Sequence, residues 1–278
     1  SMKATTIKAS RKASAGVKHA LLILLSFIAV FPLYWMIVSS FKNEAEIFGS
    51  ALLPTAPTFN NYIYAFQSMP IWRMLGNSIV MSVLMTTLQL CTSLLAAYAL
   101  TRWDFKGKKL IYGLLSLCWL IPVQAIMIPN YVTIVNMGLK ENLLGIVLPT
   151  AATAFAILNL FQVFEAFPRA LIDAARMDGD SEWGILTRVI LPNIKASVAS
   201  LGILLFINSW NDYMWPMLIT SKLENAPIQI GLRTFVSSDT NMWGALMAAT
   251  TISCIPILLL YLFMQRQIVD SFVKWGIK

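Results

Sequence analysis

Charged residues are scarce in this chain of 278 residues, and several kinds of chemistry are missing with them. Asp, Glu, Lys and Arg make up 12% of the sequence, about half the share of a soluble domain, while 58% is hydrophobic. There is one histidine, His19, with no neighbouring nucleophile, and there is no GxxxxGK[S/T] loop for ATP. The cysteines, Cys91, Cys118 and Cys254, lie in apolar runs without metal or redox spacing, so we expect small buried hydrophobic residues. These absences exclude a soluble enzyme or metal site and favour an integral membrane protein.

Long apolar runs are what the sequence has instead. A helix needs about 20 apolar residues to cross a bilayer, and on that measure the sequence predicts an all-α, polytopic membrane protein with six transmembrane helices. The predicted spans are residues 20–40, 74–100, 110–129, 143–164, 196–219 and 242–264. The first run is too long for a signal peptide and lacks an A-x-A cleavage site. We therefore expect an N-terminal tail (1–18, in which Ser1 resembles a tag scar), a six-span domain (19–264) and a C-terminal tail (265–278).

The distribution of Lys and Arg predicts the orientation. Sixteen of the 21 basic residues lie in the segments 2–18, 101–109, 165–195 and 265–278. The other five lie in the segments 41–73, 130–142 and 219–241 or at their ends. The positive-inside rule then puts both termini and the 165–195 loop in the cytoplasm. The net charge of +8 follows from this bias and not from a basic stripe, so no nucleic-acid partner is expected. The outward segments are too short to form a substrate-binding domain, so we expect another protein to capture the substrate.

The segment 165–192 is polar, charged and helix-forming, unlike its surroundings. One helical face carries Leu171, Ala174, Ala175 and Asp178, at spacings i, i+3, i+4 and i+7. Gly179 follows where a helix ends in a left-handed residue, and Asp180 or Ser181 can cap the next helix. Pro168 suits a first helical turn, and Pro192 is expected to close the run. The pattern predicts a short helix, a sharp bend and a second helix in water.

The run DAARMDGDSEW…ILP resembles the EAA loop of permease subunits in binding-protein-dependent ABC importers. The pattern of that loop is E-A-A-x-x-x-G, some nine residues, then I-x-L-P, and the matching positions are Ala174, Ala175, Gly179, Ile190, Leu191 and Pro192. Asp173 replaces the usual Glu, and Asp180 stands where Ala is common. The resemblance implies that the loop docks into a cleft of a separate ATPase subunit. The implied coupling residues are Asp173, Ala174, Ala175, Asp178, Gly179, Leu191 and Pro192. The alternative is an ordinary amphipathic helix at the membrane interface.

A second polar cluster, residues 208–216, lies inside a predicted span. Asp212 is the only acidic residue in any of these spans, roughly 24 Å along a helix that starts at residue 196. Asn208 and Asp212 are one turn apart, as are Asn211 and Trp215. Aromatic rings beside hydrogen-bonding groups suit a sugar, so these four residues are the predicted substrate path. An interfacial aromatic belt with an interhelical hydrogen bond explains the pattern equally well.

The same cluster extends the resemblance. WNDYMWPMLI is similar to the W-N-x-[FY]-x-W-P run in the carbohydrate-uptake branch of these permeases, and TFNNYIYAF and the tail MQRQIVDSFVKWGIK also resemble that branch. The implied fold is that of a type I ABC importer permease, like the six-span second permease of maltose-type systems. The implied function is import of a sugar or oligosaccharide across a bacterial cytoplasmic (inner) membrane.

The resemblance also implies partners. They are a second homologous permease subunit, two ATP-binding subunits that hold ATP and Mg, an extracytoplasmic solute-binding protein and the lipid bilayer. This chain itself is expected to carry no cofactor and to be no enzyme. One alternative keeps the role and changes the cargo to glycerol-3-phosphate or its diesters, although the spans contain almost no Lys or Arg to bind phosphate. Another is an ion-coupled secondary transporter, for which Asp212 is the one candidate relay group.

Overall fold

The computed structural model describes the backbone of residues 2–236 and 241–276, and the side chains of residues 16–236 and 241–267. Within these residues the regular elements are helices, and the only β pairing is an isolated bridge between Val236 and Asn241. The chain divides into two compact units, residues 1–68 with 235–254 and residues 69–234 with 255–278. The basic side chains of Lys3, Lys8, Arg11, Lys12, Lys274 and Lys278, used above for the orientation, lie outside the described side chains.

The first unit contains α1 (Met2–Ser39), α2 (Asn60–Ser68) and the first part of α13 (Trp243–Gly276). The backbone is helical from Met2, so the predicted N-terminal tail continues the first helix. The segment after α1 is folded tightly: Lys42 is fully buried, donates to the Ala51 carbonyl at 2.6 Å and lies over the Trp35 ring at 4.1 Å. The carbonyl and the aromatic face compensate the buried ammonium group.

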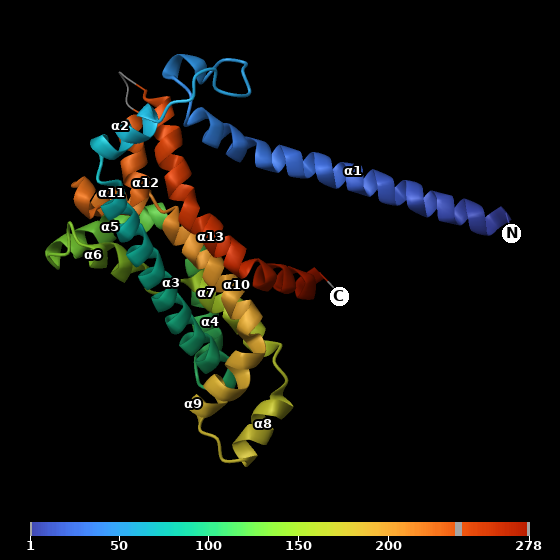
Figure 1. Ribbon diagram of the computed structural model, residues 1–278. Helices are drawn as coiled ribbons and strands as arrows, with labels where there is room; N and C mark the ends of the chain where they lie inside the picture. The colour runs from blue at the N-terminus through green and yellow to red at the C-terminus, as the bar shows by residue number, and fades with distance from the viewer. Residues whose placement is uncertain (1, 237–240, 277–278) are drawn as a thin grey trace. The chain divides into compact units, whose positions relative to one another are not determined.

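The second unit is built on the long helix α3 (Ile71–Arg102), which packs against α7 (Ala154–Glu165) and α10 (Leu191–Trp210) (Figure 1). The remaining helices of this unit are α4 (Lys108–Leu120), α5 (Val123–Asn136), α6 (Leu143–Val147), α8 (Arg169–Met177), α9 (Glu182–Gly184), α11 (Met214–Ile219) and α12 (Ile228–Leu232). One buried cluster joins α3, α7, α8 and α10 around Tyr98, Phe164 and Ile185. A second lies around Trp215 and Ile146.

The candidate spans agree with the predicted six. Four helical segments are long and apolar enough to cross a membrane: Gly16–Ser39, Ile71–Arg102, Glu182–Trp210 and Trp243–Gln267. Two bent pairs pass the same test together, Lys108–Leu120 with Val123–Asn136 and Leu143–Thr150 with Ala154–Glu165, bent by 97° and 46°. The sequence analysis treated each pair as one unbroken span. The first pair breaks at Pro122, because a proline forces the preceding Ile121 into an extended conformation.

The predicted fifth span, 196–219, is wrong at both ends. The helix begins at Glu182 and ends at Trp210, and a separate helix, α11, starts at Met214. Pro216 explains the break, since a continuous helix would bring its ring against the carbonyl of residue 212. Pro192 does not close the preceding segment but lies in the first turn of α10. A π-helical turn, Ile185–Ile190, precedes it and shifts the hydrogen-bond register before the proline.

The prediction that the cysteines are buried is wrong for two of them. Cys91 and Cys118 are exposed on the surface of this chain, and Cys254 is partly buried. The physical reason is that the outer face of a membrane helix is apolar, so residues in an apolar run need not face the protein interior.

Candidate functional site

Residues 168–184, which we call the elbow, form the helix, bend and second helix that the sequence predicts. Gly179 has φ 86°, in the left-handed region. The Gly179 N–H bonds to the Arg176 carbonyl at 3.1 Å, and the Asp180 N–H bonds to the Ala175 carbonyl at 3.0 Å. These two bonds are the pair that closes a helix at a left-handed glycine. Ser181 then caps the next helix by accepting from the Gly184 N–H at 3.1 Å.

The predicted coupling residues divide between two sides of the elbow. Asp173, Ala174 and Asp178 are exposed, whereas Ala175 and its neighbour Ile172 are buried against the rest of the unit. These exposed side chains lie on the side of α8 that points away from the rest of the unit. Leu191 is partly buried and Pro192 is exposed at the start of α10, beyond the π-helical turn.

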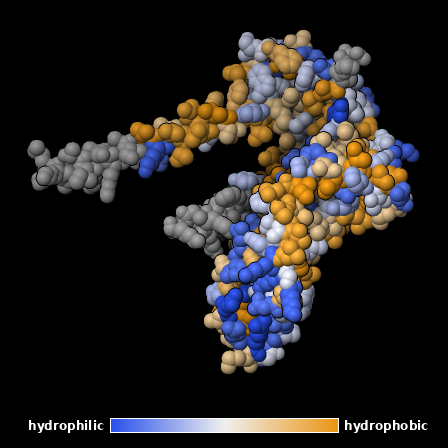
Figure 2. Space-filling model, turned by 180° about the vertical axis from the view of Figure 1, so that it is seen from behind, coloured by the Kyte–Doolittle hydropathy of each residue, from blue (hydrophilic) through white to orange (hydrophobic). Residues whose placement is uncertain are grey.

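The exposed surface of the elbow also carries large apolar residues that were not predicted from the sequence. Met177 is 89% exposed and Trp183 is 65% exposed, one on each side of the bend. Figure 2 shows hydrophilic side chains gathered over the end of the second unit that carries α8 and α9. Large apolar side chains in such polar surroundings are typical of a protein-binding surface. Their position beside Gly179 in a polar loop is the sequence signal that could have found them.

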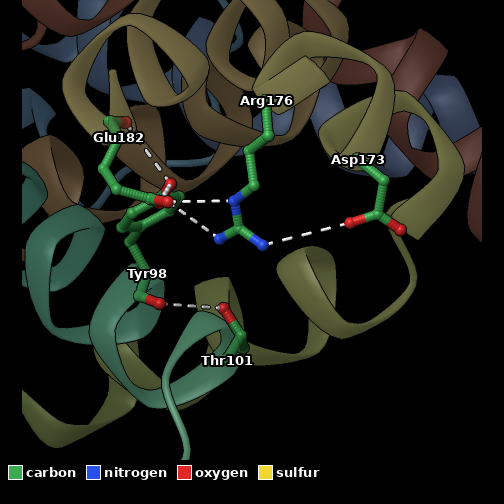
Figure 3. A network of polar contacts seen from close by, with 5 residues as sticks. All are labelled: Tyr98, Thr101, Asp173, Arg176 and Glu182. Atoms are coloured by element: carbon green, nitrogen blue, oxygen red, sulfur yellow. Dashed lines mark hydrogen bonds and ion pairs between the residues drawn. The ribbon is translucent and has the colours of Figure 1, made fainter. Parts of the chain in front are cut away.

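A network of polar contacts fixes the elbow to α3 (Figure 3). The buried Tyr98 hydroxyl of α3 donates to the Glu182 carboxylate of α9. The same carboxylate accepts from Arg176 of α8, at 2.9 Å from Nη2 and 3.0 Å from Nε. Arg176 also lies 3.9 Å from Asp173. Charge-assisted hydrogen bonds from two directions hold Glu182, so the ends of α8, α9 and α3 are joined. We call Tyr98, Arg176 and Glu182 the clamp.

A second ion pair lies directly after the bend. Arg188, in the π-helical turn, lies 2.7 Å from Asp180. The Arg188 side chain is 69% exposed, so solvent screens this pair more than it screens the clamp. The sequence analysis assigned no role to either network. Tyr98 lies 84 residues before Glu182, and no local spacing rule connects them.

The other end of α10 opens into a cavity of about 420 Å³. Three residues of the predicted cluster line it, Asn208, Ser209 and Asp212, together with Gln89, Thr150 and Thr153 from α3 and the α6–α7 connection. Gln89 donates to the Thr150 carbonyl at 2.8 Å. Asp212 directly precedes Tyr213, the N-cap residue of α11. Asn208 makes no side-chain hydrogen bond to the residues that the structure describes. The cavity therefore combines the Asp212 carboxylate with an Asn208 amide that is free to bind a ligand.

The other two residues of the predicted substrate path do not line this cavity. Asn211 is exposed, and its side-chain oxygen accepts from Gln229 at 3.4 Å. Trp215 is 5% exposed and donates from its indole nitrogen to the Ile146 carbonyl at 3.2 Å. The structure thus brings Asn208 and Asp212 together and places Trp215 in the second buried cluster.

Comparison with known proteins identifies the class that this fold and site define. Residues 89–274 match the family of binding-protein-dependent transport system inner membrane components, and the chain belongs to that family. Its fold is that of an ABC importer permease. A structure of a bacterial ABC transporter involved in the import of the acidic polysaccharide alginate matches with a TM-score of 0.79 and 25% identity. The match covers 92% of this chain and 97% of the other.

Individual relatives carry more specific names. The chain is 31% identical over 259 residues to the arabinooligosaccharides transport system permease protein AraQ of Halalkalibacterium halodurans (91% of this chain, 93% of AraQ). It is 28% identical over 255 residues to the lactose transport system permease protein LacG of Rhizobium radiobacter (92% and 93%). It is 31% identical over 265 residues to the sn-glycerol-3-phosphate transport system permease protein UgpE of Yersinia pestis (92% and 94%).

Proposed function

We propose that this chain is a permease subunit of an ATP-driven ABC importer for a sugar or oligosaccharide, and that the elbow couples ATPase motion to alternating access. The clamp is the observation that supports the proposed coupling. Because Tyr98, Arg176 and Glu182 join α8 to both α3 and the start of the long helix that includes α10, a displacement of α8 moves two spans together. The permease names of AraQ and LacG support the sugar cargo.

The proposed assembly follows the resemblance in the sequence. A second homologous permease completes the path, an extracytoplasmic solute-binding protein delivers the sugar, and two ATPase subunits bind ATP and Mg. Both termini and the elbow lie in the cytoplasm, where an ATPase can reach Met177, Trp183 and the exposed residues Asp173, Ala174 and Asp178. This chain then contributes movement and a path, and no catalytic step.

A Gly179→Val variant of the complete transporter tests the coupling. The bend needs a left-handed residue, which a β-branched side chain strongly disfavours, although a Cβ would meet no atom within 4 Å. We expect the complex to assemble but ATP-dependent uptake of a labelled oligosaccharide into proteoliposomes to be lost. Gly113→Val is the matched control, since Gly113 is helical and a Cβ there also meets open space. Normal uptake by the Gly179→Val complex would contradict the proposal.

The cavity at the other end of α10 favours a neutral cargo over glycerol-3-phosphate. Its lining includes the Asp212 carboxylate and no Lys or Arg, which a phosphate would require. Uptake assays with a labelled arabinooligosaccharide and labelled glycerol-3-phosphate separate these cargoes. Uptake of either one by a preparation without the ATPase subunits would instead identify an ion-coupled secondary transporter.

A further inference from the structure

A small polar cavity lies between the end of α3 and α8. Its volume is about 190 Å³, against the ~30 Å³ that one water molecule occupies in the liquid. Three guanidinium groups line it, those of Arg102, Arg169 and Arg176, with the carboxylates of Asp104 and Asp173. Arginine clusters of this kind bind phosphate and carboxylate groups, because the planar fork matches two oxygens at once.

The charges around this cavity are not balanced. Arg176 pairs with Glu182 and Asp173, and Asp104 pairs with Lys108 at 3.2 Å. Arg102 and Arg169 form no ion pair with any residue that the structure describes. Glu165 stabilises the positive charge of Arg102 from beyond ion-pair distance. The like charges of Arg169 and Arg176 destabilise it. Two cations without a counter-ion therefore face one polar cavity.

Arg102 is also incompletely hydrogen-bonded. Its Nη2 donates to the Phe164 carbonyl at 2.8 Å, which fixes the guanidinium group between α3 and α7. Its Nε is buried and has no partner in the described part of the chain. A buried charged donor without a partner costs free energy. An anion in the cavity, held between Arg102 and Arg169, would neutralise the charge excess.

The position of the cavity indicates the source of that anion. It lies where the spanning helix α3 ends, and the C-cap residue Trp103 is 48% exposed. Tryptophan is enriched at the boundary between lipid and water. Arg102, Lys106, Lys108 and Lys109 form a basic run directly after the span, and basic runs and pockets at this depth attract anionic phospholipids. We propose that Arg102 and Arg169 bind the phosphate of an anionic phospholipid headgroup, at the junction of α3 and the elbow. This proposal does not depend on the cargo or on ATP.

Lipid retention by the complete transporter tests the proposal. The purified complex is equilibrated in detergent with radiolabelled phosphatidylglycerol or phosphatidylcholine, and the lipid that stays bound through gel filtration is measured. We expect wild type to retain phosphatidylglycerol in preference to phosphatidylcholine. Arg169→Gln should weaken phosphatidylglycerol binding about five-fold, the effect of one basic residue near an anionic surface. Arg169 is exposed and forms no hydrogen bond or ion pair with the described part of the chain, so this variant should assemble.

Two further variants make the result specific. Lys106→Gln removes one exposed cation from the same basic run but not from the cavity lining, and it should lower retention less than Arg169→Gln does. Arg102→Lys keeps the charge but loses the planar fork, and it should bind less phosphatidylglycerol than wild type. Equal retention of both lipids by wild type, or equal losses in Arg169→Gln and Lys106→Gln, would overturn the proposal.

The same preparation separates other sources of the anion. If wild type shows no preference for phosphatidylglycerol, but inorganic phosphate raises the melting temperature of lipid-depleted wild type and not of Arg169→Gln, the lipid proposal is overturned and the site is assigned to free phosphate. Loss of ATPase subunits from Arg169→Gln with lipid retention unchanged would overturn the lipid proposal. The occupant would then be an acidic side chain of the partner.

Discussion

The long helix that includes α10 meets irregular structure at both ends, and the two ends are held differently. At the elbow, Glu182 receives hydrogen bonds from Tyr98 and Arg176, and Ser181 caps the helix. At the other end, residues 211–213 break the helix, and Asn208 lies in a cavity without a side-chain hydrogen bond to any described residue. The first end is tied to neighbouring helices by charged groups, whereas the second leaves polar groups available. The elbow end therefore suits the transfer of force, and the cavity end suits contact with a polar solute.

Breaking the clamp should have the largest effect. Glu182→Ala leaves the buried Tyr98 hydroxyl and Arg176 without their shared partner, which costs about 1–3 kcal/mol. We expect ATP-dependent uptake in proteoliposomes to fall about ten-fold or more, since each 1.4 kcal/mol is a factor of ten. ATP hydrolysis measured in the same vesicles should fall much less.

Arg188→Gln is the control for the clamp. It removes the exposed ion pair to Asp180 within the same elbow, and exposed pairs contribute about 0–1 kcal/mol. Equal losses of uptake in Glu182→Ala and Arg188→Gln would mean that the clamp couples the helices no more strongly than an exposed ion pair does.

Removing the Asn208 side-chain amide should lower the affinity for substrate without changing the coupling of ATP hydrolysis to uptake. Asn208→Ala deletes one neutral hydrogen-bonding group from the cavity, worth about 0.5–1.5 kcal/mol, so the KM for uptake should rise about two- to ten-fold. Asn211→Ala, three residues later and outside the cavity lining, should leave the KM unchanged. An identical KM in both variants would remove Asn208 from the substrate path.

Trp215→Phe should change stability and leave the KM unaltered. It deletes the buried hydrogen bond to the Ile146 carbonyl, worth about 1 kcal/mol. For a chain of this size that is a fall of roughly 2–4 °C in melting temperature, measured on the detergent-solubilised complex. A raised KM with an unchanged melting temperature would return Trp215 to the substrate path.

The smallest effect concerns the pH dependence of stability at the loop between α5 and α6. Glu141, between α5 and α6, accepts from the backbone N–H groups of Ser221 and Lys222 and from the Asn225 amide. Burial raises its pKa, but these hydrogen bonds together outweigh burial and hold the pKa below the ordinary 4.5. The stabilisation is therefore complete above about pH 4.5. It is lost as the pH falls through the lowered pKa of the folded state.

The measurement is the melting temperature of wild type and Glu141→Gln between pH 6 and pH 3. Wild type should lose a small extra stability toward acid pH that the variant does not lose. Parallel curves would show that Glu141 does not hold the segment after α11.

Much of the fold could be predicted from local sequence. Apolar length located the six spans, and the order of Gly179 and Ser181 predicted the bend and the cap, because each depends on residues within one or two helical turns. The failures have local causes too. Pro122 and Pro216 break helices that hydropathy alone joined, and the exposed Cys91 shows that an apolar run does not reveal which helix face is buried.

The candidate site was predicted less completely. The sequence pointed to the exposed Asp173, Ala174 and Asp178, and it placed Asn208 and Asp212 one turn apart. It did not connect Tyr98 with Glu182, and it did not separate Asn208, which lines the cavity, from Trp215, which is buried. Both distinctions depend on which helices pack together.

The sequence by itself determined that this protein lies in a membrane, which segments are apolar enough to span it and where the bend at Gly179 falls, since hydropathy and glycine conformation act over short distances along the chain. The tertiary structure alone decided which polar groups face one another, because α3 and α9 meet only after the helices between them have packed.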